Sequence, residues 1–252
     1  MYSQLITGQS AALIGKPFSF PPDVLDPHGR IIRIIFAEAE KIRLRKVVTR
    51  SRARTTYSYW TWKLDREAQG ESVNEVNGFI LLDSDPHVAW FAEQCCEITY
   101  LDDSGDERSH YPDVLIKLDR DWLFWEVKTK ADAQADEVSS RTDLMVRELP
   151  TLGFDYEIKL AEELARRPRF EIADRLRRFG KRPMTFLERE QLQQHLVREG
   201  SLTWGNACSG LYGRPGKEIL CRAVLEGILS VDLNSKLSYA SEFVPGVLNI
   251  WR

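Results

Sequence analysis

Residues 110–128 have the sequence HYPDVLIKLDRDWLFWEVK, and this stretch decides the fold of the chain. Its two ends, 110–116 and 122–128, are apolar runs rich in β-branched and aromatic residues, a composition typical of strands. The polar residues between the runs predict a turn, so we expect the strands to pair as a hairpin. Pairing brings Asp113 close to Glu126, and side-chain alternation places Glu126 and Lys128 on one face.

Two acids and a lysine at one end of a hairpin have the chemistry that metal-dependent cleavage of a phosphodiester requires. The carboxylates of Asp113 and Glu126 are ligands for a hard cation, and Lys128 can stabilise negative charge or orient the attacking water. The alternative is a solvated face with a surface ion pair. Two details favour the site: the acids lie in apolar runs, where an unpaired charge is costly, and Pro112 directly precedes Asp113.

A helix is predicted upstream, from about Glu71-Ser72 to about residue 83, with apolar residues at helical spacing. Ser72 is a good N-cap and Glu75 follows three residues later, which fits a capping box. Glu75 therefore has two alternative roles, as the cap itself or as a further carboxylate of the metal site. His110 lies close to Asp113 in the sequence, and we expect it to be a bystander rather than a base.

The order of these residues resembles the PD-(D/E)xK nuclease superfamily: an acid on a helix, then Pro-Asp, then Glu-x-Lys. A longer series between about residues 45 and 130 resembles the N-terminal domain of TnsA-type transposon-end endonucleases. Its members are TRSRAR at 49–54, YSYWTWK at 57–63, ES at 71–72, LLDSDPHV at 81–88, EQ at 93–94, YPD at 111–113 and WEVK at 125–128. Each piece is short, and the ordered series carries the resemblance.

The resemblance implies a role for each matching residue. Glu75 matches the helix-borne catalytic acid, with Glu71 as a nearby competitor, Asp113 the metal-binding aspartate, and Lys128 the catalytic lysine. Glu126 fills the position two before the lysine. The implied cofactor is Mg²⁺, for which Mn²⁺ substitutes. The catalytic set is Glu75, Asp113, Glu126 and Lys128, and the metal set is Glu75, Asp113, Glu126 and the Val127 carbonyl.

Charge is unevenly distributed, although the net charge is only −3. Residues 41–54 carry basic side chains and no acid, and 166–182 form a second basic stretch. Basic patches of this kind make phosphate contacts, which dominate affinity for DNA. A solvated loop or helix face is the alternative. The residues that we select as DNA contacts are Arg50, Arg52, Arg54, Lys63, Arg214, Lys217 and Arg222.

We divide the chain into a leader (1–40), a nuclease domain (41–168) and a C-terminal domain (169–252). The expected class is α/β (α+β), with a restriction-endonuclease-like mixed sheet flanked by helices. In it we predict strands at 97–101 and 154–158 and a helix at 131–149. The C-terminal domain is predicted to have helices at 170–179, 185–199, 203–209 and 215–225, then strands at 228–233 and 237–243, the order of a winged helix. We give equal weight to two roles of this domain, contact with DNA and contact with a protein partner.

Composition agrees with an intracellular nuclease, since 43% of the residues are hydrophobic, enough to bury a core. Cys95 and Cys96 are adjacent, a poor disulfide, and no zinc spacing appears, so we expect reduced thiols at all four cysteines. No secretory signal and no apolar run of membrane-spanning length is present. We expect a cytoplasmic location (bacterial cytosol or nucleoid) and no membrane partner.

The resemblance implies a specific function: hydrolysis of the 5′ strands at transposon ends during cut-and-paste transposition. The implied partners are double-stranded DNA, an integrase-like transposase subunit that cuts the 3′ ends, and an AAA+ ATPase regulator. Two alternatives remain open. One is a stand-alone endonuclease of repair, restriction or phage defence, and the other is a non-catalytic DNA-binding assembly module.

Overall fold

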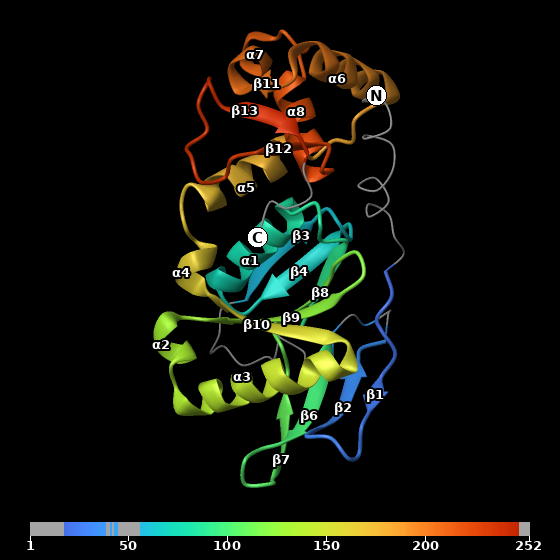
Figure 1. Cartoon of the computed structure of the whole chain (residues 1–252), viewed down its shortest axis with the longest axis vertical. Helices are drawn as coiled ribbons and strands as arrows, with labels where there is room; N and C mark the ends of the chain where they lie inside the picture. Colours follow the sequence, from blue (N-terminus) through green and yellow to red (C-terminus); the bar gives the residue numbers. More distant parts are fainter. Residues whose placement is uncertain (1–17, 39–40, 42, 45–55, 247–252) are drawn as a thin grey trace. The chain divides into compact units, whose positions relative to one another are not determined.

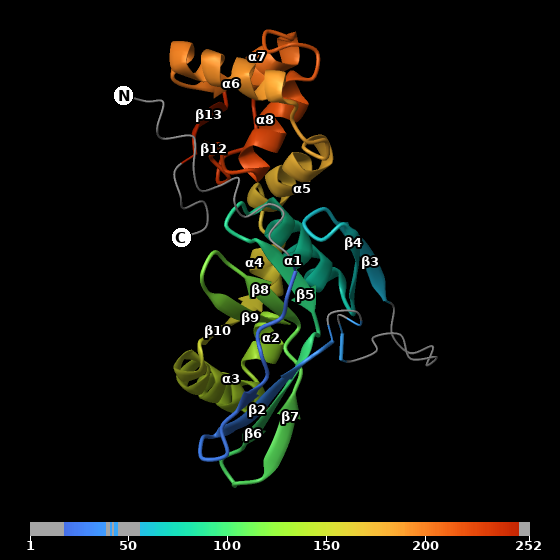
Figure 2. The same ribbon diagram turned by 90° about the vertical axis from the view of Figure 1, so that its right-hand side faces the viewer.

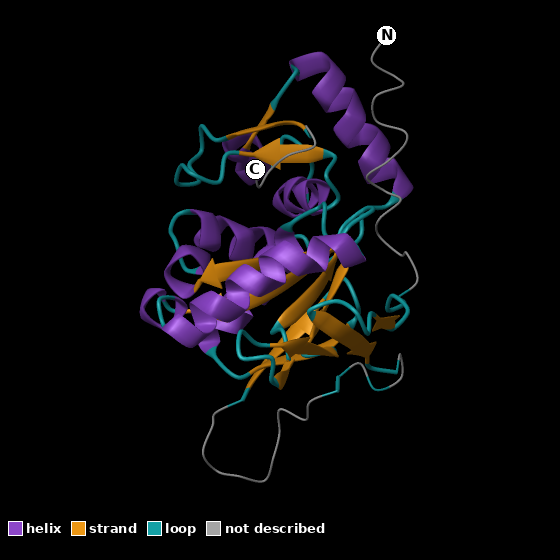
Figure 3. Cartoon of the chain, turned by 60° about the horizontal axis from the view of Figure 1, so that its bottom comes forward, coloured by secondary structure: helices purple, strands orange, loops and turns teal. Residues whose placement is uncertain are grey.

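The computed structural model describes residues 18–38, 41, 43–44 and 56–246 (Figure 1). These residues form two compact units. The first contains 18–79 and 88–165, and the second contains 80–87 and 166–246. Helices and strands occur in both units, as the purple and orange elements of Figure 3 show, and the expected mixed α+β class is confirmed.

The sheet that carries the candidate site is four-stranded and mixed, in the order β10-β9-β8-β5. The predicted hairpin is present, because β8 and β9 pair antiparallel with Val114 opposite Trp125. The strand β10 adds in parallel beside β9, and β5 pairs antiparallel with β8. The bounds are β5 Trp90–Glu93, β8 Val114–Lys117, β9 Trp122–Lys128 and β10 Phe154–Leu160.

The predicted single strand at 110–116 is wrong in one respect, because the structure divides it between two sheets. β7 (Glu107–His110) pairs with β6 (Cys96–Leu101) in a second sheet of order β1-β2-β6-β7, and β8 begins only at Val114. The three residues between them include Pro112, which has no N–H to donate to a ladder. The chain therefore changes sheet immediately before Asp113.

Part of the predicted leader belongs to this second sheet. β1 (Val24–Leu25) pairs with β2 (Ile31–Phe36), and β2 pairs with β6 (Figure 2). Ile31 and Ile34 are at most 1% exposed, so this segment contributes to the core of the first unit. Residues 18–38 are thus an integral part of that unit rather than a separate leader.

The remaining elements of the first unit surround the mixed sheet. The hairpin of β3 (Tyr57–Thr61) and β4 (Arg66–Gly70) precedes α1 (Val73–Ser84), whose predicted position is confirmed and whose residues up to Phe79 belong to this unit. The helix expected at 131–149 is divided into α2 (Lys130–Ala133), α3 (Asp136–Glu148) and the 3-10 turn η1 (Leu149–Leu152). These helices connect β9 to the parallel strand β10, and α3 packs along β10. α4 (Ala161–Leu164) follows β10.

Aromatic side chains fill the core on both faces of the mixed sheet. The rings of Phe79 and Phe91 stack with centroids 5.5 Å apart, and those of Phe124 and Phe154 stack at 5.3 Å. Phe79, Phe91 and Phe124 are completely buried. Burial of each such side chain contributes about 1.5–3 kcal/mol relative to exposure, so the strands that position the site have a rigid support.

The second unit follows the predicted order of helices, with one error in the strands. Its elements are α5 Arg169–Phe179, α6 Phe186–Glu199, β11 Leu202–Thr203, α7 Trp204–Ser209, α8 Gly216–Leu225, β12 Leu229–Val231 and β13 Glu242–Pro245. A capping box formed by Thr185 and Glu188 begins α6. The strand expected at 237–243 begins only at Glu242, because Ser238 and Ser241 form a turn in which the Ser241 N–H donates to the Ser238 carbonyl over 3.0 Å.

Two further expectations concern cysteines and membranes. All four cysteines are free thiols, and Cys208 is the exposed one. Across the helices of the described residues, none combines the length and apolar character needed to cross a bilayer.

Candidate active site

The carboxylate of Asp113 is fixed by the end of the hairpin. The ladder between β8 and β9 finishes at Val114 and Trp125, so the N–H of Val127 lies beyond the backbone pairing of these two strands. That N–H donates instead to Asp113 Oδ2 over 2.7 Å. Asp113 is thereby held opposite the strand that carries Glu126 and Lys128, as strand alternation predicted.

Glu126 and Lys128 form a close ion pair on this strand. Lys128 Nζ lies 2.6 Å from Glu126 Oε1 and 4.0 Å from Asp113 Oδ2. The Glu126 side chain is 5% exposed, compared with 25% for Lys128. The structure therefore brings the three predicted residues together, with Glu126 buried, the Asp113 side chain 15% exposed and the lysine reaching toward solvent.

The two carboxylates repel one another strongly in this position. Burial raises the pKa of Asp113 to about 8, with a further contribution from the charge of Glu126. Burial alone would lower the pKa of Lys128, but the carboxylates of Glu126 and Asp113 outweigh it, and the pKa is raised. The lysine is thus a stable cation, and the acid pair is a place where positive charge is favoured.

Three residues that the sequence did not select complete the surroundings of Glu126. Arg141, from α3, places its NH2 group 3.3 Å from Glu126 Oε1. His110 Nε2 lies 3.1 Å from the Tyr156 hydroxyl and 3.4 Å from Glu126 Oε2. Burial lowers the pKa of His110 to about 3, with help from Arg141 and Lys128, so His110 is neutral at physiological pH. The expected bystander role of His110 stays a prediction.

Glu75 forms the predicted N-terminal cap of α1. Its backbone N–H donates to Ser72 Oγ over 3.2 Å, while its carboxylate accepts from Ser72 Oγ at 2.8 Å and from the Glu71 N–H at 3.0 Å. Gly70 allows this arrangement, because a Cβ there would lie 3.1 Å from the Cβ of Glu75. Burial raises the pKa of Glu75, and its charge acts on Asp113. The structure thus supports the capping role directly.

The Glu93-Gln94 pair of the motif series has two structural tasks. The completely buried Glu93 accepts both terminal nitrogens of Arg66, at 3.0 and 2.6 Å, and the Nε of Arg43 at 2.6 Å. Gln94 has a positive φ of 44°, unusual for a residue other than glycine. In this conformation its N–H donates to the Asp113 carbonyl at 3.0 Å.

The side chain of Gln94 connects both acidic elements of the site. Its Nε2 donates to Glu71 Oε1 over 3.3 Å, while its backbone holds the segment that carries Asp113. Sparsely populated backbone conformations persist where the surroundings enforce them, and they concentrate at functional sites. Gln94 therefore positions the N-terminus of α1 relative to Asp113.

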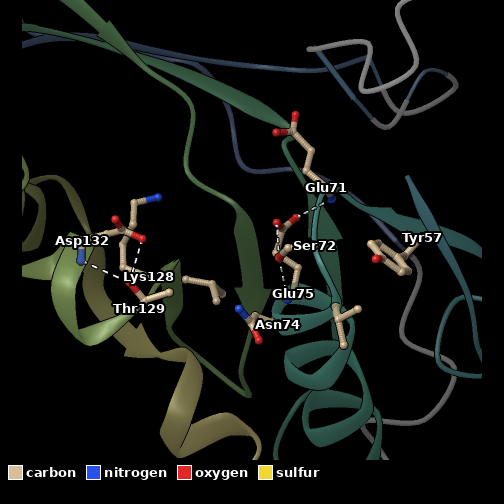
Figure 4. Close-up of a pocket in the computed structure, with 10 residues that line it drawn as sticks. Tyr57, Glu71, Ser72, Asn74, Glu75, Lys128, Thr129 and Asp132 are labelled. Atoms are coloured by element: carbon tan, nitrogen blue, oxygen red, sulfur yellow. Dashed lines mark hydrogen bonds between the residues drawn. The ribbon is translucent and has the colours of Figure 1, made fainter. Parts of the chain in front are cut away.

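A cleft of about 530 Å³ opens between the N-terminus of α1 and the end of β9. Figure 4 shows Tyr57, Ser72 and Glu75 on one side of it and Lys128, Thr129 and Asp132 on the other. Its full lining is Tyr57, Glu71, Ser72, Val73, Asn74, Glu75, Val127, Lys128, Thr129 and Asp132. Asp113 and Glu126 do not line it, and Lys128 connects them to this cleft through its ion pairs.

The acid pair fits a hard divalent cation. Within the described residues, no three histidine, cysteine or carboxylate side chains are placed to hold one metal ion. The candidate donors are the carboxylates of Asp113 and Glu126, together with the backbone carbonyl of Val127, the residue that follows Glu126. Glu126 Oε2 is buried and accepts no hydrogen bond of ordinary geometry, although His110 Nε2 lies 3.4 Å from it. Carboxylate and carbonyl oxygens are the ligands that Mg²⁺ prefers.

The residues selected as DNA contacts have different environments. Arg50, Arg52 and Arg54 lie outside the described residues. Lys63 donates to the Val88 carbonyl and lies 5.7 Å above the Trp62 ring, so it is engaged within the protein. Its selection stays a prediction.

In the second unit, Arg214 is exposed and Lys217 is half-buried, with its Nζ 5.5 Å from the Phe179 ring. Arg222 is only 5% exposed. Its Nε donates to Glu226 Oε1 over 2.6 Å. A side chain with so little exposed surface has none to offer a phosphate, and we therefore do not retain Arg222 as a DNA contact.

Comparison with known proteins assigns no family: no protein-family model matches the chain, and no curated protein matches it.

Proposed function

We propose that this protein is a Mg²⁺-dependent DNA endonuclease whose centre is the hairpin of β8 and β9. The observation that carries the proposal is the pair of a part-buried Asp113 and a buried Glu126, with Lys128 in contact with Glu126 at 2.6 Å. Metal-assisted hydrolysis of a phosphodiester requires acids that bind the ion and a cation near the phosphate. Asp113 and Glu126 are two acids that repel one another, and Lys128 reaches a polar cleft. The ordered motif series supports the same conclusion.

The residues divide the work between holding the ion and binding the phosphate. Asp113, Glu126 and the Val127 carbonyl would hold Mg²⁺, which supplies a Lewis acid for the phosphate and the attacking water. Lys128 would exchange its ion pair with Glu126 for one with the scissile phosphate. Its side chain is the most exposed of the three, so it can reach a bound strand. Arg141 then holds the Glu126 carboxylate in place. Glu75 orders the first turn of α1 beside the cleft.

The arrangement of helices and strands in each unit also supports the proposed endonuclease. The mixed sheet β10-β9-β8-β5 with α1 and α3 is compatible with the restriction-endonuclease-like domain that we propose. In the second unit, the order α6, β11, α7, α8, β12, β13 and the sheet order β11-β13-β12 are those of a winged helix. Its α8 would be the recognition helix, but eight of its ten residues are buried and α5 packs against it. These buried residues are not available to DNA, so we propose no DNA contact through them.

The biological role that fits the motif series is that of a TnsA-type subunit. In this role the protein cuts the 5′ strands at transposon ends, with an integrase-like transposase for the 3′ strands and an AAA+ ATPase as regulator. A cytoplasmic location follows from that role. The stand-alone endonuclease is the second candidate, because the acid pair and lysine by themselves support cleavage without any partner.

Cleavage of an end-labelled duplex tests the proposal. Wild type, Asp113→Ala and Lys128→Ala are incubated with Mg²⁺, with and without a transposase encoded beside this gene. Nicking of 5′ strands that requires Asp113, Lys128 and the transposase is the expected result. Nicking that requires both residues but no transposase identifies the stand-alone enzyme. Nicking that survives both substitutions excludes this site as the catalytic centre.

A further inference from the structure

We infer that the cleft between α1 and β9 binds one unpaired nucleotide of the DNA strand being cut, with its base stacked on Tyr57. This inference rests on the proposed function and deepens it, because it names the form of DNA that the site accepts. The volume of about 530 Å³ lies within the range of 300–1,000 Å³ that small-ligand pockets occupy. A base pair within an intact duplex cannot enter such a cleft, so the nucleotide must leave the stack.

Tyr57 is the aromatic surface of this cleft. It lies at the start of β3, is 36% exposed, and makes no ring pair with another aromatic side chain among the residues whose structure is described. Its partner across the hairpin is Gly70, which has no side chain to cover the ring. Among the strands of the described residues, the hairpin of β3 and β4 pairs with no other strand, and it lies beside α1 (Figure 2). Every base offers a π-face for stacking on such a ring.

The polar lining offers a nucleotide one cation, Lys128, and the amide of Asn74, beside three acids, Glu71, Glu75 and Asp132. Lys128 provides a cation for its phosphate. The side-chain amide of Asn74 offers donors and an acceptor for a base edge, and carboxylates such as Glu71 accept from exocyclic amines. The arrangement thus orders the ligand, with phosphate near β9 and base near Tyr57 (Figure 4).

Trp60 provides a matched control on the same strand. It is more exposed than Tyr57, at 59%, but it lies three residues further along β3 and so faces the other side of the strand. It does not line the cleft. If any exposed aromatic side chain served DNA binding, both Tyr57→Ala and Trp60→Ala would weaken it. If the base stacks in the cleft, only Tyr57→Ala weakens it.

The test compares two duplexes in buffer with EDTA, which prevents metal-dependent cleavage. One duplex is fully paired and the other carries a single unpaired 2-aminopurine, whose fluorescence reports stacking. We expect wild type, Tyr57→Phe and Trp60→Ala to bind the duplex with the unpaired base more tightly. Tyr57→Ala should lose about 5- to 150-fold of that affinity, since stacking on an aromatic side chain contributes about 1–3 kcal/mol per base.

Other outcomes separate this inference from the proposed function. Equal affinity of wild type for both duplexes, no measurable binding of either, or an unchanged preference in Tyr57→Ala would overturn the nucleotide site. A Tyr57-dependent preference in a protein that does not nick DNA with Mg²⁺ and its transposase keeps the nucleotide site and refutes the nuclease. Nicking by a protein that shows no preference for the unpaired base keeps the nuclease and refutes the nucleotide site.

Discussion

Replacement of Glu93 by glutamine should destabilise the first unit severely. The Glu93 carboxylate is completely buried, and it receives two hydrogen bonds from Arg66 and one from Arg43, at 2.6–3.0 Å. Glutamine keeps the shape but removes the charge, so two largely buried guanidinium groups lose their counter-ion. Breaking a buried ion pair in this way costs about 3–5 kcal/mol of unfolding free energy. For a protein of this size that corresponds to a fall of about 6–20 °C in Tm, at about 2–4 °C per kcal/mol.

The assay must observe the first unit separately, because the chain has two compact units and need not unfold in one step. Hydrogen exchange of the peptides that cover β4 and β5 provides this, together with a urea titration. Glu67→Gln is the matched control on β4, since Glu67 is exposed and should change stability by no more than about 0.5 kcal/mol. An unfolding free energy of Glu93→Gln within about 1 kcal/mol of the wild-type value would refute the reasoning. This ionic cluster would then not be what holds β5 and the neighbouring Asp113 segment in place.

Two further predictions concern charge. Arg141→Gln should weaken Mn²⁺ binding about 10- to 100-fold, because Arg141 orients the ligand Glu126; calorimetry checks this, with Arg147→Gln as control, and equal affinities would contradict it. Hydrogen bonds from Arg182 hold the pKa of Glu188 down to about 2, so its stabilisation is present above about pH 4.5 and is lost toward pH 2. The advantage of wild type over Glu188→Gln in urea titrations should therefore shrink across that range; a constant difference would count against it.

The local part of the site was predictable from the sequence. Asp113, Glu126 and Lys128 meet because strand alternation and hairpin pairing act over a few residues, and both are visible in the pattern of apolar side chains. The capping box of Ser72 and Glu75 was predictable for the same reason, since its spacing is fixed by the geometry of one helical turn.

Residues that reach the site through tertiary contacts were not predictable. Arg141 meets Glu126 only because α3 packs beside β10 after the crossover, and no local motif marks it. Gln94 was part of the motif series, but its positive φ depends on contacts with both Asp113 and Glu71. Arg222 looked like a surface cation, because helical periodicity does not reveal that a second helix covers its face and that Glu226 pairs with it.

The most direct test of the acid pair as the catalytic centre is Mg²⁺-dependent nicking by Asp113→Asn beside Asp119→Asn, in the presence of the neighbouring transposase. Asp113→Asn keeps the shape of the side chain but removes the charge that the ion requires. Asp119 lies in the exposed turn of the same hairpin, outside the site. The account predicts nicking by wild type and Asp119→Asn and none by Asp113→Asn. Undiminished nicking by Asp113→Asn would contradict it.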